Sequence, residues 1–281
     1  MSYIVKNVRD FNPDHIFDCG QCFRWERQED GSYTGTAMGK IARVSFDGGT
    51  LAIDNCDSGD YEATWRNYLD MDTDYGMIKD FLAKSDPTIR AACEYGGGIR
   101  ILRQDFWEAT VSFIISQNNN IPRIKGCIEA LCAGFGEKIG EYGGKEFFDI
   151  PSPETLASLS AADLAPIRLG YRAPYLVKAA SQMLEQGGPD AVRDRLASAD
   201  DPIAELQDFC GIGPKVASCI SLFGLGRMDA FPIDVWMRRV MNRLYGIDEK
   251  DTKGMSSYAA GHFGEYGGIA QQYLFYYIRS L

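Results

Sequence analysis

The sequence predicts an α+β fold, in which an N-terminal antiparallel β-sheet with helices precedes an all-helical domain. Two observations predict it. The first part of the chain contains short segments rich in β-branched and aromatic residues, separated by Gly or Asp turns. After the glycine run at residues 96–98, apolar residues recur at helical spacing almost to the C-terminus. We therefore expect a first domain over residues 1–98 and a second over residues 99–281.

The predicted elements follow in chain order. In the first domain, strands are expected at residues 20–25, 32–37, 41–46 and 50–54, and a helix at residues 61–82. Gly48 and Gly49, between the last two strands, are typical of a tight hairpin turn. In the second domain, helices are expected at residues 105–116, 123–135, 175–186, 204–210, 215–223, 235–245 and 270–279. Helix-start signals at Ser152 and Ser160 predict two further short helices.

The composition is that of a globular protein in a reducing compartment. The 281 residues are 45% hydrophobic and 24% charged, and every apolar stretch is too short to span a membrane. The N-terminus lacks the apolar core of a signal peptide, and eight cysteines without an export signal indicate reduced thiols. We expect a cytoplasmic protein, located with the nucleoid DNA if the organism is bacterial.

Metal-ligating patterns are weak. Cys19 and Cys22 form one C-x-x-C pair with no second pair at zinc-site spacing, and His15 and His262 are the two histidines of the chain. No cysteine follows Cys219, which excludes a C-terminal four-cysteine iron–sulfur loop. We therefore expect no zinc or iron–sulfur site.

Charge is unevenly distributed. The formal net charge of −10 disfavours nucleic-acid binding, which usually needs a basic face. Residues 209–247, however, contain five basic side chains against Asp229 and Asp234: Lys215, Arg227, Arg238, Arg239 and Arg243. A local positive patch on an acidic protein is expected, with strongly salt-sensitive binding.

The segment Gly211-Ile-Gly-Pro-Lys215, with Asp234 nineteen residues after the lysine, carries the clearest chemistry. A glycine-rich turn that opens a helix exposes backbone N–H groups at the positive end of the helix dipole, and these can bind a phosphate. A lysine at that helix start can act as a nucleophile, and a returning carboxylate can direct protons. Residues 204–223 are thus predicted to form a helix-hairpin-helix that binds DNA backbone. A plain turn or a non-catalytic DNA-binding module is the alternative, and the Lys215–Asp234 pair favours an enzyme.

This segment and Phe231-Pro-Ile-Asp-Val resemble the helix-hairpin-helix and Gly/Pro/Asp signature of the base-excision DNA glycosylase superfamily, in its lysine-bearing lyase branch. Four more segments resemble the 8-oxoguanine DNA glycosylase family in particular: residues 20–25 (GQCFRW), 116–123 (SQNNNIPR), 169–173 (LGYRA) and 268–275 (GIAQQYLF). The resemblance implies a glycosylase that excises 8-oxoguanine opposite cytosine and then cleaves the strand by β-elimination. A glycosylase for a different oxidised purine is the alternative within the superfamily.

The resemblance also implies residue roles. Lys215 would attack the sugar C1′ and form a Schiff base, and Asp234 would stabilise the positive charge that develops on the sugar. For the lesion, a Gly20 main-chain carbonyl would accept from the protonated N7. Gln271 would bind the Watson–Crick edge of the base, and Cys219 and Phe275 would sandwich the flipped ring.

The resemblance also implies roles in binding the DNA duplex, from which the target nucleotide must be extruded. Asn118 would fill the vacated stack, and Tyr171 would wedge next to the damaged pair. Arg123 and Arg172 would bind the cytosine left opposite. The hairpin backbone at Gly211 and Gly213 would bind phosphate. Trp236 stands where many family members have a phosphate-contacting histidine, so DNA docking or pocket shape is expected to differ here.

No cofactor is expected to be required. The resemblance implies one optional ion, a structural monovalent cation or calcium, held by hairpin carbonyls near Gln207, Phe209 and Ile212. The expected partner is double-stranded DNA containing oxidised guanine, and the protein is expected to be a monomer without membrane association.

Overall fold

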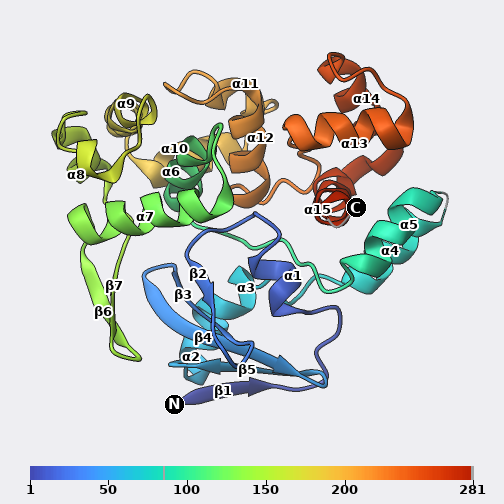
Figure 1. Ribbon diagram of the computed structural model, residues 1–281, viewed down its shortest axis with the longest axis horizontal. Helices are drawn as coiled ribbons and strands as arrows, with labels where there is room; N and C mark the ends of the chain where they lie inside the picture. Colours follow the sequence, from blue (N-terminus) through green and yellow to red (C-terminus); the bar gives the residue numbers. More distant parts are fainter. Residues whose placement is uncertain (85, 280–281) are drawn as a thin grey trace.

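The computed structural model describes residues 1–84 and 86–279 (Figure 1). A β-sheet occupies one end of the molecule and helices gather at the other, so that the sheet and the helical part form separate layers (Figure 1). This arrangement confirms the predicted α+β class. No helix within the described residues is long and apolar enough to cross a bilayer.

Five antiparallel strands form the sheet in the order β1-β5-β4-β3-β2. They are β1 (Ser2–Val5), β2 (Trp25–Arg27), β3 (Tyr33–Ala37), β4 (Lys40–Asp47) and β5 (Thr50–Asp54). Three of the four predicted strands are confirmed with small shifts at their ends. β1 has no predicted counterpart. β2 starts at Trp25, because residues 20–24 form a loop that other segments hold by hydrogen bonds to Gln21.

The helices before residue 98 differ from the single predicted helix at 61–82. They are α1 (Pro13–Phe17), α2 (Ser58–Asp60), the π-helix η1 (Tyr61–Trp65), α3 (Arg66–Tyr68), α4 (Tyr75–Ala83) and α5 (Pro87–Tyr95). The prediction of one continuous helix was wrong, because Asp70 adopts a positive φ of 50° and Asp74 then caps a new helix by accepting from the Met77 N–H.

The second half is helical apart from one hairpin. Its helices are α6 (Phe106–Ser116), α7 (Ile121–Phe135), α8 (Pro153–Ser158), η2 (Ala165–Ile167), α9 (Arg172–Glu185), α10 (Pro189–Ala197), α11 (Pro202–Leu206), α12 (Pro214–Phe223), α13 (Val235–Tyr245), α14 (Thr252–Phe263), η3 (Gly264–Tyr266) and α15 (Gly267–Ile278). The hairpin pairs β6 (Lys138–Tyr142) with β7 (Lys145–Phe148), so this domain is not all-helical as predicted. Gly143 and Gly144, at positive φ, make its turn.

Two other expectations differ locally. The helix expected at 204–210 ends at Leu206, because the next three N–H groups donate to carbonyls only three residues back and tighten the chain into the hairpin turn. The start signal at Ser160 leads into turns and the short 3₁₀-helix η2.

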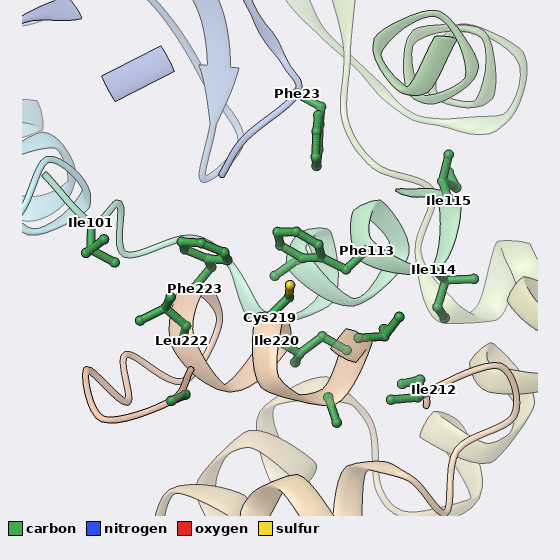
Figure 2. Close-up of a cluster of buried hydrophobic side chains, with 14 of the residues drawn as sticks. Phe23, Ile101, Phe113, Ile114, Ile115, Ile212, Cys219, Ile220, Leu222 and Phe223 are labelled. Carbon is green, nitrogen blue, oxygen red and sulfur yellow. The ribbon is translucent and has the colours of Figure 1, made fainter. Parts of the chain in front are cut away.

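Two hydrophobic clusters form the core. The smaller joins side chains of the sheet to those of α1, η1 and α3. It includes Trp25, Trp65 and Tyr68, whose rings contact one another. The larger fills the helical part and also takes in Ile78 and Ile89 from α4 and α5. Figure 2 shows a part of this cluster in which Phe113 and Phe223 lie beside the sulfur of Cys219. The larger core therefore includes side chains from before and after residue 98.

Candidate active site and DNA-binding face

The turn between α11 and α12 is a sharp hairpin in which only glycine fits at position 211. Gly211 has φ +80°, and a Cβ there would lie 2.6 Å from the Cβ of Tyr175. Its carbonyl accepts from the Gln117 Nε2 at 2.9 Å, while the Cys210 N–H donates to the Gln182 Oε1 at 2.7 Å. Side chains from α9 and from the α6–α7 connection therefore hold the turn in place.

Lys215 is the second residue of α12, directly after Pro214 at the first helical position. Its Nζ donates to the Ser116 Oγ at 3.4 Å and lies 5.3 Å from the ring centre of Phe113. The helix start thus places the amine against the C-terminal end of α6, half-buried and close to an aromatic face.

Asp234 caps α13. One carboxylate oxygen accepts from the Met237 N–H at 2.8 Å, and the residue is half-buried. Among the ion pairs of the described residues there is none between Lys215 and Asp234. The carboxylate and the amine nevertheless line the same pocket, so that a ligand between them can meet both.

That pocket collects all six residues expected to act on the sugar or the base: Gly20, Lys215, Cys219, Asp234, Gln271 and Phe275. Segments as far apart as residue 20 and residue 275 meet there. Four further residues line the pocket without having been predicted from the sequence: Phe113, Phe223, Pro232 and Gln272. The cavity measures about 40 Å³. Pockets that enclose a small molecule are usually several hundred Å³, so side chains must move for a base to enter.

Cys219 lies one helical turn after Lys215, on the same face of α12. Burial raises the pKa of its thiol, and the nearby Lys215 amine lowers it by less. The thiol therefore stays neutral near pH 7, and its sulfur packs beside Phe113 (Figure 2). A neutral, polarizable sulfur is suited to contact the face of an aromatic ring.

The loop that carries Gly20 is fixed by its neighbour. Gln21 is fully buried and donates to the carbonyls of Ile16 and Arg100, at 2.9 and 2.8 Å. Its own side-chain oxygen accepts from the Leu102 N–H at 2.9 Å. Gly20 itself has φ +87°, and a Cβ there would lie 3.4 Å from the Phe275 ring. The backbone of Gly20 is thus held rigidly at the pocket edge.

A second cluster forms around the α6–α7 connection and gathers the residues expected to fill the gap, to wedge next to the damaged pair and to bind the opposite cytosine. Asn118 is exposed and strained, with φ 46°. Tyr171 is 48% exposed and donates from its hydroxyl to the Gln117 carbonyl at 3.2 Å. Arg123 is exposed and donates to the Arg168 carbonyl at 3.1 Å.

Arg172 occupies a different position within this cluster. It is buried and donates to the main-chain oxygens of Gln117, Asn118 and Leu169. Its guanidinium also lies 4.5 Å from the ring centre of Tyr171. In this structure Arg172 therefore supports the Asn118 loop from within.

The exposed face of α13 is basic and carries an aromatic residue. Trp236 is 47% exposed, and the Arg239 guanidinium lies 5.1 Å from its ring centre. Arg243 follows one turn later, and no ion pair within the described part of the chain involves Arg238, Arg239 or Arg243. By contrast, Arg227 is neutralised by Asp229. The positive patch is therefore narrower than the sequence predicts, and α13 carries most of it.

No group of three or more His, Cys, Asp or Glu side chains that could hold a metal ion occurs among residues 1–84 and 86–279. Gln207, Phe209 and Ile212 line one open cavity at the hairpin turn. Their groups facing an ion would be carbonyl oxygens, the ligand type that hard cations prefer, although the Phe209 carbonyl also accepts from the Ile212 N–H at 3.1 Å.

Comparison with known families shows which class of protein has these features. Residues 111–262 match the HhH-GPD superfamily of base excision DNA repair proteins, the class of DNA glycosylase that the hairpin, the lysine and the capping aspartate define. Residues 3–110 match the N-terminal domain of 8-oxoguanine DNA glycosylase. The chain belongs to the 8-oxoguanine DNA glycosylase family, whose enzymes are DNA N-glycosylases with DNA lyase activity.

Individual relatives are similar to this protein over nearly its whole chain. The structure of MBOgg1 with a low affinity DNA ligand is 43% identical, with a TM-score of 0.93, over 99% of this chain and 96% of that one. The 8-oxoguanine glycosylase/lyase of Clostridium acetobutylicum, bound to DNA with cytosine opposite 8-oxoG, is 39% identical, with a TM-score of 0.94, over 99% and 95%. The N-glycosylase/DNA lyase OGG1 of Arabidopsis thaliana is 28% identical over 92% of this chain and 75% of its own.

Proposed function

We propose that this enzyme releases 8-oxoguanine from duplex DNA, with cytosine preferred opposite the lesion, and then cleaves the strand by β-elimination through a Lys215 Schiff base. The observation that carries the proposal is the convergence of Gly20, Lys215, Asp234 and Gln271 on one pocket. The relative from Clostridium acetobutylicum supports the choice of lesion and opposite base.

The covalent step needs the amine and the carboxylate at one sugar. The Lys215 Nζ attacks C1′ as the bond from C1′ to the base breaks, so that the base leaves with the electron pair and the amine loses a proton. Asp234 stabilises the positive charge that develops on the sugar. Opening of the sugar ring gives the imine. Loss of a C2′ proton then forms the C2′–C3′ double bond as the C3′–O bond breaks, and the 3′ phosphate leaves with the electron pair of that bond.

Lesion choice rests on Gly20. The N7 of 8-oxoguanine carries a proton, whereas the N7 of guanine is an acceptor. A main-chain carbonyl at the pocket edge therefore attracts the lesion and repels the normal base. The rigid anchoring of the loop by Gln21 keeps that carbonyl from turning away. Cys219 and Phe275 are proposed to hold the two faces of the ring.

DNA is proposed to dock across the hairpin, the Asn118 cluster and the exposed face of α13. The N–H groups at Gly211 and Gly213 bind backbone phosphate without reading sequence. Asn118 and Tyr171 are exposed; Asn118 fills the gap that the extruded nucleotide leaves, and Tyr171 wedges next to the damaged pair. Trp236 and the arginines beside it bind the strand near the extruded nucleotide.

The two arginines expected at the opposite cytosine have unequal access. Arg123 is exposed and can reach a base by a side-chain movement alone. Arg172 must first release main-chain carbonyls of the Asn118 loop. We infer that insertion of Asn118 into DNA and release of Arg172 occur together, which couples extrusion to the reading of the opposite base.

We also propose an ion at the hairpin. The carbonyls of Gln207, Phe209 and Ile212 would hold a monovalent or calcium ion, and the cavity that these residues line has room for it. Such an ion would add positive charge next to the phosphate. The catalytic steps given above do not require it.

Borohydride trapping tests the proposal. The wild-type protein is expected to give a covalent adduct on a duplex with 8-oxoguanine opposite cytosine. Lys215→Gln should bind this duplex and give no adduct, while Lys250→Gln, the same charge change at an exposed residue, should trap normally. Absence of an adduct with the wild-type protein would rule out the lyase mechanism. Equal cleavage opposite cytosine and adenine would rule out opposite-base reading by Arg123 and Arg172.

A further inference from the structure

We propose that Gln272 is a second base-reading residue, whose side-chain oxygen accepts a hydrogen bond from the Watson–Crick edge of the extruded guanine-type base. This inference rests on the proposed function and narrows its substrate class. Gln272 directly follows Gln271 on α15. The family resemblance implies a base contact for Gln271 and none for Gln272.

The first observation is an unpaired buried acceptor. Gln272 is 4% exposed, and its Oε1 has no hydrogen-bond partner. Four other described residues contain a buried side-chain atom in this state, and none of the four lines the active-site pocket: Arg24, Trp65, Ser221 and Tyr273. A buried polar atom without a partner destabilises the fold. A ligand that supplies an N–H at this position would remove that cost.

The second observation is the link between the two amides. The Gln272 Nε2 donates to the Gln271 Oε1 at 2.7 Å. The Gln271 oxygen already accepts this one hydrogen bond, whereas both donors of its NH₂ group remain available to a ligand. The pair offers the pocket a donor from Gln271 next to an acceptor from Gln272.

This pattern matches a guanine-type edge. Guanine and 8-oxoguanine present an acceptor at O6 beside donors at N1 and the 2-amino group. The Gln271 NH₂ can donate to O6 while the Gln272 oxygen accepts from N1–H or the 2-amino group. Adenine-type edges present a donor at N6 and an acceptor at N1, so both contacts would become repulsive. The pair therefore selects oxidised guanine over oxidised adenine.

The test separates base release from strand cleavage. Gln272→Met keeps the length of the side chain and removes both the acceptor and the Nε2 donor to Gln271. In single-turnover assays we expect this variant to release 8-oxoguanine about 10- to 100-fold more slowly than the wild type, the range expected for one buried hydrogen bond. Its β-elimination on a preformed abasic site should stay within about twofold of the wild-type rate, because that substrate has no base.

Gln272→Glu keeps an acceptor and, like Gln272→Met, lacks the donor to Gln271, so it isolates the acceptor and is expected to recover part of the loss. No recovery would assign the loss to the contact with Gln271 and overturn the inference. An equal fall of base release and abasic-site cleavage in Gln272→Met would show a structural role and overturn the inference, as would no change in either step. If the wild type cleaves abasic DNA but releases no 8-oxoguanine, the proposed substrate fails, and the assignment of Gln272 fails with it. In that case the separate lyase signal identifies the substrate as the cause.

Discussion

At the scale of the residue, Asp234 is both a helix cap and a residue of the active-site pocket. One of its oxygens caps α13, and the residue also lines the pocket that contains Lys215. Capping needs a hydrogen-bond acceptor, whereas stabilisation of a positive sugar needs a charge. The two contributions can be separated because asparagine is as good a cap as aspartate and is neutral.

Asp234→Asn should therefore leave stability nearly unchanged and lower base release by about 100-fold or more, the scale of losing one charge that stabilises a transition state. Asp234→Ala should lose the charge and also about 1 kcal/mol of stability. Thermal unfolding and single-turnover base release measure the two effects. Equal melting temperatures for the Asn and Ala variants would contradict the capping role, and full activity of the Asn variant would contradict the catalytic one.

At the scale of the element, α13 carries like charges that no acidic side chain balances. Arg239 and Arg243 are four residues apart on one exposed face, a spacing at which like charges destabilise a helix by a few tenths of a kcal/mol. Trp236 adds an exposed ring that contacts Arg239. A polyanion that lies along the helix would offset the repulsion between the arginines and cover the exposed ring.

We expect Arg239→Gln to weaken binding to undamaged duplex and to lower the slope of log affinity against log salt concentration by about 0.9, the value for one phosphate contact. Arg193→Gln is the matched control, because Arg193 is half-buried and paired with Asp190 and Asp194. Fluorescence anisotropy over a salt series gives both slopes. Identical slopes for the two variants would show that α13 does not contact the backbone.

The same scale shows what the sequence could predict. The bounds of α13 and the gathering of six pocket residues follow from motifs whose residue types are fixed by chemistry. The hairpin β6–β7 was not predicted, although Gly143 and Gly144 were its local signal. Ser116 and Gln272 could not be assigned, because contact with the Lys215 amine or with the pocket depends on packing between helices distant in sequence.

At the scale of the molecule, Asp86 joins parts of the chain from either side of residue 98. It caps α5 by accepting from the Thr88 and Ile89 N–H groups. Its other oxygen accepts from the Tyr245 hydroxyl at 2.9 Å and lies 3.0 Å from the His262 Nε2. Because the larger core also crosses residue 98, we propose that the two predicted domains unfold as one cooperative unit.

The pH dependence of stability tests this junction. Burial raises the pKa of Asp86, but the hydrogen bonds from His262, Tyr245 and the helix start outweigh it and lower the pKa below its ordinary value of 3.8. A lowered carboxyl pKa stabilises the folded state above the unfolded value, and this contribution is lost as the pH falls through the folded value. Asp86→Asn removes the titrating group.

We therefore expect Asp86→Asn to be about 1–3 kcal/mol less stable than the wild type at pH 7, which lowers the melting temperature by several degrees. The difference should shrink as the pH falls below 3.8. Calorimetry at several pH values measures it, and a single transition in both proteins is expected if the chain unfolds as one unit. A constant difference at every pH would show that the Asp86 charge is unimportant, and two separate transitions in the wild type would show that the halves unfold independently.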